Sequence, residues 1–121
     1  MTLSAASLRF PRASRIRRGS DFRRTQALGN RVVCGCLIAN WRALEAGGAG
    51  RLGVVASRRI GAAVVRNRAR RLLKEVYRLN RAAILKPVDL VLVARKSIAS
   101  SSFQEVRRDL LRAMRSAGLA A

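Results

Sequence analysis

Histidine is absent from this sequence of 121 residues, and Asp and Glu together number only six. A chain without histidine has no imidazole base, no Cys–His nucleophile pair and no imidazole ligand for a metal. Six acids spread along the chain also leave few candidates for a catalytic pair of carboxylates. The sequence therefore predicts no catalytic residue and no metal site on the protein itself.

Cysteines, aromatic residues and long apolar runs are also scarce. The only cysteines are Cys34 and Cys36. On one strand they would lie on the same face, roughly 6–7 Å apart, which does not suit a disulfide. We expect two free thiols, half-buried or in the core, in a reducing cytoplasm. No apolar run approaches the roughly 20 residues that span a membrane, so the sequence predicts a cytoplasmic protein.

Positive charge is what the sequence has in excess, since 26 Lys and Arg against six acids give a formal net charge of +20. Apolar residues still make up 50% of the chain, which predicts a folded core rather than a disordered tail. At this length we expect one domain, residues 1–121. A surface this positive repels itself, which favours a polyanionic partner, nucleic acid before an anionic membrane.

The N-terminal segment has a composition of its own. Residues 1–20 contain no acid and are rich in Arg and Ser, as mitochondrial transit peptides are. Pro11 would interrupt the long amphipathic helix that such a peptide forms. We therefore interpret residues 1–14 as a basic, flexible arm that lies along the domain or on RNA.

Local signals in the first half of the chain predict a helix and two strands. The helix begins at Ser20, which is suited to cap it, and ends at Gly29. Strands are predicted over residues 32–40 and 51–57. Since the glycine-rich residues 45–50 form a flexible turn, we expect these strands to pair as a hairpin.

The second half predicts a helix, a strand and a helix. The first helix follows Gly61, where apolar residues recur at spacings of three and four. Its stripe comprises Val65, Ala69, Leu72, Val76, Leu79 and Ala83. A buried strand follows over residues 88–94, in a βαβ unit with parallel pairing. Ser102 and Glu105 form a capping box for the last helix. Its inner stripe comprises Phe103, Val106, Leu110, Met114 and Ala117.

The densest motif is a basic stretch that ends at Glu75. Its basic residues are Arg58, Arg59, Arg66, Arg68, Arg70, Arg71 and Lys74. A solvated helix face mixes both signs of charge, and here only Arg71 and Glu75 are spaced as an i,i+4 pair. Positive charge at a helix N-terminus also opposes the helix dipole, a cost that a bound phosphate offsets. The stretch is therefore predicted to bind a polyanion.

Arg66-Asn67-Arg68, followed by Arg70-Arg71 and Glu75, resembles the RNR motif of the bacterial ribonuclease P protein component. The predicted strand at residues 51–57, which begins Arg51-Leu52-Gly53, and the segment Asp89–Lys96 resemble the motifs on either side of it in that family. Further matching pieces are Phe10-Pro11-Arg12, Arg15-Ile16-Arg17 and Asp21-Phe22. Together they extend from about residue 8 to about residue 115, in the order of the family.

The resemblance implies a fold that differs from the one read from periodicity. It is a single-domain α+β sandwich of order α-β-β-β-α-β-α, the ribosomal protein S5 domain 2-like fold, with a left-handed βαβ crossover around the RNR helix. Periodicity alone predicts the order α-β-β-α-β-α, with one strand fewer. The general rule for such connections predicts a right-handed crossover.

The resemblance also implies a function. The chain would be the protein subunit of ribonuclease P, the endoribonuclease that removes the 5′ leader of precursor tRNA. The RNA subunit would perform the hydrolysis with Mg²⁺, and the protein alone would bind no cofactor. The implied partners are ribonuclease P RNA and precursor tRNA, with no membrane and no small-molecule substrate. The alternative is a structural ribosomal RNA-binding protein, which fits the size and charge but not the ordered motifs.

Two sets of site residues follow from the resemblance. Contacts with the catalytic RNA are implied for Arg58, Arg59, Arg66, Asn67, Arg68, Arg70, Arg71 and Lys74. A cleft for the 5′ leader is implied for Phe22, Arg15, Arg17, Arg95 and Lys96. The family's second aromatic after Phe22 is replaced by Gln26, and the aromatic near Asn40 is replaced unless Trp41 serves instead. We also expect Arg66→Ala or Arg68→Ala to weaken RNA binding without harm to the fold.

Overall fold

The computed structural model describes Ile16, Arg23, Thr25, residues 29–44 and residues 50–121. The strands of this part are β1 (Asn30–Cys34), β2 (Leu37–Ala43), β3 (Arg51–Val55) and β4 (Val88–Ala94). The helices bounded within it are α3 (Ala63–Asn80) and α4 (Phe103–Ser116). Short 3-10 turns are η2 (Arg58–Ile60), η3 (Arg81–Ala83) and η4 (Lys96–Ser100). Arg23 and Thr25 are helical, while the rest of the helix predicted after Ser20 lies outside the described residues.

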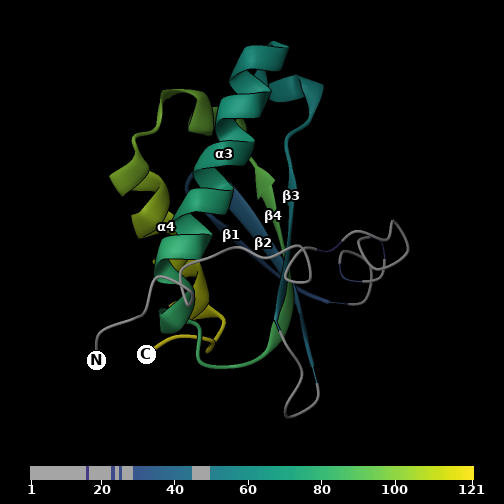
Figure 1. Cartoon of the computed structure of the whole chain (residues 1–121), viewed down its shortest axis with the longest axis vertical. Coiled ribbons are helices and arrows are strands. Elements are labelled where there is room, and N and C mark those ends of the chain that lie inside the picture. The colour runs from purple at the N-terminus through teal and green to yellow at the C-terminus, as the bar shows by residue number, and fades with distance from the viewer. Residues whose placement is uncertain (1–15, 17–22, 24, 26–28, 45–49) are drawn as a thin grey trace.

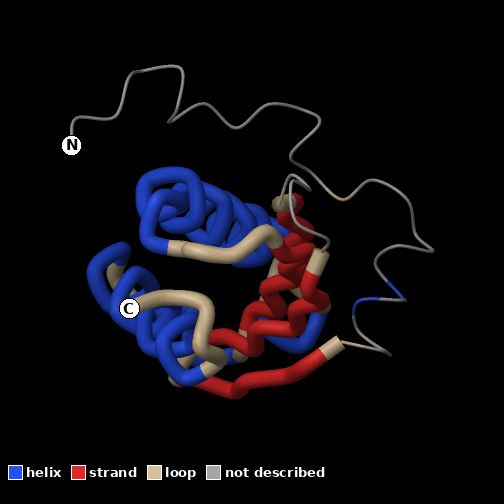
Figure 2. The backbone as a smooth tube through the Cα atoms, turned by 90° about the horizontal axis from the view of Figure 1, so that it is seen from below, coloured by secondary structure: helices blue, strands red, loops and turns tan. Residues whose placement is uncertain are grey.

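The four strands form one mixed sheet in the order β1-β2-β4-β3, and α3 and α4 cover the same face of it (Figures 1 and 2). The core lies between this face and the two helices, where Ala39, Leu52 and Leu92 are almost fully buried. The predicted α+β sandwich is confirmed. None of the helices in the described part is long and apolar enough to cross a membrane.

The strand predicted over residues 32–40 is wrong, because the chain turns at Gly35 and forms the hairpin of β1 and β2. Gly35 has φ +56°, a left-handed conformation that favours glycine. A Cβ at this position would collide with the carboxylate of Asp109 on α4. That carboxylate accepts a hydrogen bond from the backbone N–H of Cys36 at 3.0 Å. The strand count implied by the family resemblance is therefore confirmed.

The turn at Gly35 places the two cysteines in different surroundings, because Cys34 is the last residue of β1 and Cys36 lies in the turn. Both are free, with Cys34 half-buried and Cys36 buried, as predicted. Burial and the neighbouring Asp109 carboxylate raise the pKa of Cys36 to about 11. Burial alone would raise the pKa of Asp109, but the hydrogen bonds from Cys36 and Arg108 hold it below its usual value.

The hairpin predicted between residues 32–40 and 51–57 is also wrong. β3 pairs in parallel with β4, with Leu52 opposite Leu90, and β4 separates β3 from β2. The predicted βαβ unit is confirmed. β4 lies inside the sheet, between β2 and β3, and its side chains are buried on both faces. Figure 1 shows that the crossover is left-handed, since β4 lies to the left of β3 with α3 in front. The reason lies in the packing. β2 occupies one edge of β4, so β3 must pair with the other edge, and α3 lies on the same face of the sheet as α4.

The buried side of α3 is rotated from the predicted stripe. Its buried residues are Ala69, Leu73, Val76 and Tyr77. Leu79 is 40% exposed, and Ala83 lies beyond the helix in η3. For α4, the capping box of Ser102 and Glu105 is confirmed, and so are the buried positions Val106, Leu110 and Met114. The other two residues of the predicted stripe, Phe103 and Ala117, are half-buried against the core. Sheet packing selects one side of a helix, whereas the capping box is a local feature of the sequence.

On the sheet face away from α3 and α4, a buried acid joins three neighbouring strands. Asp89 in β4 is opposite Arg42 in β2 and Arg51 in β3. Its carboxylate accepts hydrogen bonds from Arg42 at 2.9 Å and from Arg51 at 2.9 and 2.7 Å. Burial alone would raise the pKa of Asp89, but the two guanidinium groups hold it below its usual value. This ion cluster therefore ties β2, β3 and β4 together.

Candidate nucleic-acid interface

Two basic segments that are far apart in the sequence meet at one end of the molecule. Because β3 and β4 are parallel, their carboxyl ends reach the same edge of the sheet. The turns that follow them, η2 and η4, contact each other beside the start of α3 (Figure 1). Arg58 and Arg59 in η2 therefore lie at the same end as Arg95, Lys96 and the RNR motif.

Each Asp and Glu of the described part already has a hydrogen-bond or ion-pair partner, so none of them is left to neutralise the basic residues at the start of α3. Asp89 pairs with Arg42 and Arg51, and Asp109 with Arg108 and the Cys36 N–H. Glu105 caps α4. Glu75 pairs with Arg78 rather than with Arg71, the residue spaced from it as an i,i+4 pair. The hydrogen bond from Arg78 lowers the pKa of Glu75.

Several basic side chains at this end consequently have no partner in the described part of the chain. Among the described residues, no hydrogen bond or ion pair is made by the side chains of Arg58, Arg59, Arg66, Arg71, Lys74 and Lys96. Arg58, Arg59 and Arg71 are exposed, and Arg66 is half-buried with its Nε shielded and unpartnered. Positive charge left uncompensated around a helix N-terminus is suited to bind phosphates.

Two arginines of the RNR region instead make contacts within the protein. Arg68 donates to the backbone carbonyls of Ile98 at 3.3 Å and Ser101 at 2.9 Å, which joins α3 to η4. Arg70 donates to the side-chain oxygen of Asn67 at 3.0 Å and to the carbonyl of Ala56 at 3.3 Å. The acceptors are neutral, so both positive charges remain available to an external anion.

These contacts of Arg68 correct the expectation that Arg68→Ala leaves the fold unharmed. Arg68→Ala removes the partner of two carbonyls, and we expect it to lower the free energy of unfolding by roughly 1–3 kcal/mol. Arg71→Ala, a surface arginine of the same helix, is the matched control and should leave stability within about 0.5 kcal/mol. Urea unfolding followed by circular dichroism measures both. Equal stability of the two variants would show that the Arg68 contacts contribute nothing to the fold.

The residues predicted for the leader cleft are only partly described. Arg95 and Lys96 are exposed, and Arg95 donates to the carbonyl of Gly35 at 3.0 Å, which ties it to the β1–β2 turn. Arg15, Arg17 and Phe22 lie outside the described residues. Trp41, considered as a replacement cleft aromatic, packs against the core. Of the leader residues, the structure therefore brings Arg95 and Lys96 next to the RNR motif.

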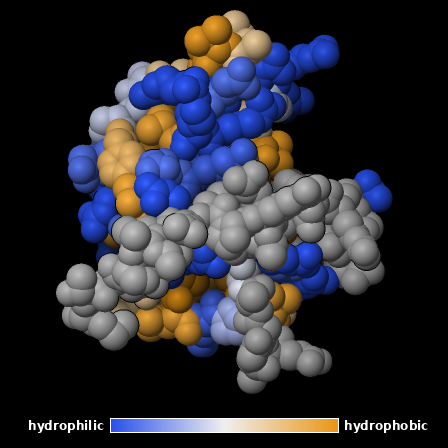
Figure 3. Space-filling model, in the orientation of Figure 1, coloured by the Kyte–Doolittle hydropathy of each residue, from blue (hydrophilic) through white to orange (hydrophobic). Residues whose placement is uncertain are grey.

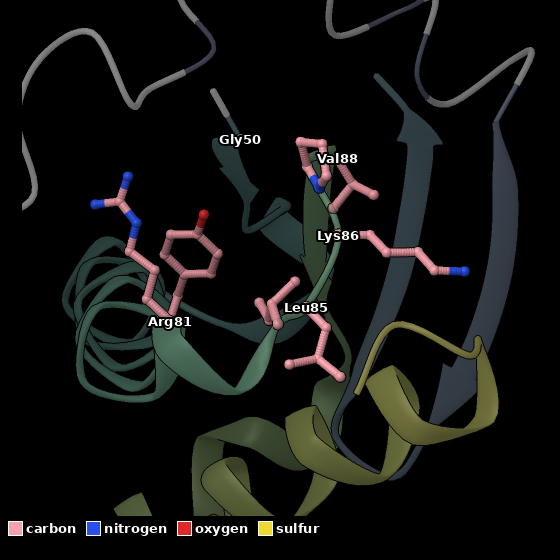
Figure 4. A pocket seen from close by; sticks show the side chains of 8 residues that line it. Gly50, Arg81, Leu85, Lys86 and Val88 are labelled. Atoms are coloured by element: carbon pink, nitrogen blue, oxygen red, sulfur yellow. The ribbon is translucent and has the colours of Figure 1, made fainter. Parts of the chain in front are cut away.

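A cavity of about 220 Å³ lies at the opposite end of α3, where the chain leads into β4 (Figure 4). Arg81 and Lys86 both border it, but Lys86 points away from Arg81, so the two cations do not converge on one point. The Arg81 guanidinium lies 6.0 Å from the centre of the Tyr77 ring. Burial raises the pKa of Tyr77. Within the part of the chain that the structure describes, this end thus has no cluster of converging cations like the one at the other end.

No group of three or more Cys, Asp or Glu side chains capable of holding a metal occurs among the described residues. These residues do not fit a metal site, and no chemical step is assigned to a protein-bound ion. The geometry of this end can instead bind, orient and neutralise a polyanion through guanidinium and ammonium groups.

Comparison with known proteins gives consistent matches over most of the chain. A family model described as "Ribonuclease P" matches residues 10–118. The ribonuclease P protein component of Desulforapulum autotrophicum is 36% identical over 104 residues, covering 86% of this chain and 88% of that protein. The one from Gluconacetobacter diazotrophicus is 33% identical over 109 residues, covering 89% of this chain and 94% of that protein.

Solved structures match in fold as well. The RNase P protein of Staphylococcus aureus superimposes with a TM-score of 0.80 at 23% identity, covering 91% of this chain and all of that one. The RNase P protein of Thermotoga maritima gives a TM-score of 0.72 at 29% identity, covering 81% and 92%. The chain belongs to the bacterial ribonuclease P protein family, the protein component of the ribonucleoprotein endonuclease that matures the 5′ ends of tRNAs.

Proposed function

We propose that the chain binds ribonuclease P RNA through one surface at the start of α3. This RNR surface comprises Arg58, Arg59, Arg66, Asn67, Arg68, Arg70, Arg71 and Lys74. The observation that carries the proposal is the cluster of cations that have no partner among the described residues. An RNA backbone supplies the missing negative charge, and release of its counterions drives binding.

The members of the RNR surface have different tasks in this proposal. Arg58, Arg66 and Arg71 are free to form direct contacts with phosphates. Asn67 holds Arg70 by a side-chain hydrogen bond, and so orients a guanidinium that also reaches the carbonyl of Ala56. A guanidinium group that is held in a fixed orientation can make a bidentate contact with a phosphate. Asn67 is therefore a positioning residue.

The 5′ leader of precursor tRNA is assigned to the neighbouring segment. Arg95 and Lys96 follow β4 at the same end as the RNR surface, so one end of the protein would hold the leader beside the catalytic RNA. The family resemblance adds Phe22, Arg15 and Arg17 to this leader site. We assign Mg²⁺ to the RNA, where it would supply the hydrolytic chemistry. The chain would act as a single RNA-binding domain in the bacterial cytoplasm.

Salt dependence provides the test of this function. With about six Arg–phosphate contacts, the logarithm of the affinity for ribonuclease P RNA should fall against the logarithm of salt concentration with a slope of about −4 to −5. Arg66→Ala should make this slope less negative by about 1. Titrations across a salt series measure both values. A slope near zero would contradict binding through the RNR surface.

The ribosomal alternative is set aside by the family membership. When mixed with ribonuclease P RNA and precursor tRNA at low Mg²⁺, the protein should stimulate 5′ maturation of the tRNA by the catalytic RNA. A structural ribosomal protein gives no specific stimulation, so an unrelated basic ribosomal protein is a suitable control.

A further inference from the structure

A groove of about 400 Å³ lies between α3 and the start of α4, next to the RNR surface. Its apolar lining is formed by Val64, Leu72 and Phe103. Two arginines of the RNR surface, Arg68 and Arg71, border it as well. Figure 3 shows the setting, in which a mainly hydrophilic surface over α3 is interrupted by small hydrophobic areas. We call this feature the α3–α4 groove.

Packing within the chain covers the apolar lining only in part. Phe103 and Leu72 pack against the core but stay half-buried, and Val64, at the second position of α3, is 77% exposed. Fully buried apolar residues on the same two helices, such as Leu73 and Val106, show where the core lies. An exposed apolar surface framed by polar groups is typical of a binding site.

The charge around the groove indicates what it binds. Arg71 has no partner among the described residues, and Arg68 contacts only neutral carbonyls. Glu75, the acid at the border, is already paired with Arg78. An apolar slot with two uncompensated cations favours a ligand that combines a flat apolar group with negative charge. An unpaired nucleotide has both, a base with a π-face and a phosphate.

Of the two arginines that border the groove, Arg68 has a guanidinium that is held in place and could stack on a base. Nη1 of Arg68 donates to the carbonyl of Ile98 and Nη2 to that of Ser101, so its guanidinium plane is held from two points. Unpaired RNA bases stack on aromatic rings and on guanidinium planes. The groove thus offers the Phe103 ring together with a pre-oriented guanidinium.

We propose that the α3–α4 groove receives one unpaired nucleotide of ribonuclease P RNA, with its base against Phe103 and its phosphate near Arg71. This inference rests on the proposed RNA-binding function and adds a contact, the base against the Phe103 ring, that does not depend on the charge of the protein. Phe103, which the apolar periodicity of α4 placed in the inner stripe, would then contribute to RNA affinity.

Phe103→Leu tests the proposal, because leucine keeps an apolar side chain and removes the aromatic ring. Affinity for ribonuclease P RNA should fall by about 5- to 100-fold, while the salt slope stays unchanged since no charge is lost. Leu79→Ala is the matched control, because Leu79 is a 40% exposed leucine on α3 that does not line the groove. It should bind RNA like the unchanged protein.

A second variant keeps the test valid if Phe103→Leu lowers the melting temperature. Phe103→Trp should retain RNA affinity, and the added indole fluorescence should be quenched on binding, beyond any change of Trp41 in the unchanged protein. Unchanged affinity of Phe103→Leu, equal losses for Phe103→Leu and Leu79→Ala, or absence of quenching would each overturn the proposal. An apolar protein partner in the groove predicts the first of these results. If the unchanged protein itself fails to bind the RNA, the proposed function fails instead.

Discussion

A variant with Arg58→Ala, Arg66→Ala and Arg71→Ala should bind ribonuclease P RNA on the order of 100-fold or more weakly than the unchanged protein. The three side chains make no hydrogen bond or ion pair among the described residues, so their loss breaks none there. The melting temperature should stay the same or rise, because less positive charge is concentrated at one end. Filter binding or fluorescence titration at fixed salt measures the affinity.

A charge-matched variant distinguishes the RNR surface from the net charge of the chain. Arg31, Arg112 and Arg115 are also exposed and without a partner among the described residues, but they lie in β1 and on α4. Replacement of these three by Ala removes the same charge and should weaken binding by less than about 10-fold. Equal losses in the two variants would mean that RNA binds the positive protein non-specifically, and the RNR surface would lose its role.

Asp89→Ala should lower the free energy of unfolding by about 3–5 kcal/mol, the largest stability effect expected here. The carboxylate is fully buried and pairs with the half-buried Arg42 and Arg51, so the substitution removes its charge-assisted hydrogen bonds to both guanidinium groups. Glu75→Gln is the control, because its pair with Arg78 is exposed and should contribute less than about 1 kcal/mol. Chemical unfolding at pH 7 measures both. A similar small loss for both variants would contradict the structural role of the Asp89 cluster.

The same cluster predicts an acid-sensitive fold. The pKa of Asp89 is lower in the folded chain than in the unfolded one, where it should be near its ordinary value. Its contribution to stability is therefore fully present above the unfolded pKa and is lost as the pH falls through the folded pKa. Asp89→Asn should show less of this loss on acidification, since the substituted side chain does not titrate in that range.

Local signals were sufficient for several elements. The capping box of Ser102 and Glu105 predicts the start of α4 because the atoms that form it lie within one helical turn. The apolar run Val88–Ala94 predicts β4, since a strand buried on both faces needs apolar residues throughout. The turn at Gly35 was missed, because its glycine lies against the carboxylate of Asp109, which binds the N–H of the next residue, Cys36, from 73 positions away. An acid within the apolar side of α4 was the available signal.

Strand pairing depended on contacts that no local pattern contains. Residues 51–57 follow the first strands directly, so a hairpin was the simplest expectation. In the structure β4 takes the place beside β2, and β3 is left at the edge. This arrangement, with α3 on the face that α4 also covers, makes the crossover left-handed against the general rule. Only the family resemblance anticipated it.

The sequence by itself determined that the chain carries a positive surface for a polyanion, a βαβ unit, and an RNR motif. These properties follow from composition and from spacing along one helix. The tertiary structure alone decided which arginines are free and which are held, because the acceptors of Arg68 and Arg70 are backbone carbonyls brought close by folding. It also brought Phe103 from α4 next to the RNR helix, since helix packing and not sequence distance sets which side chains share a groove.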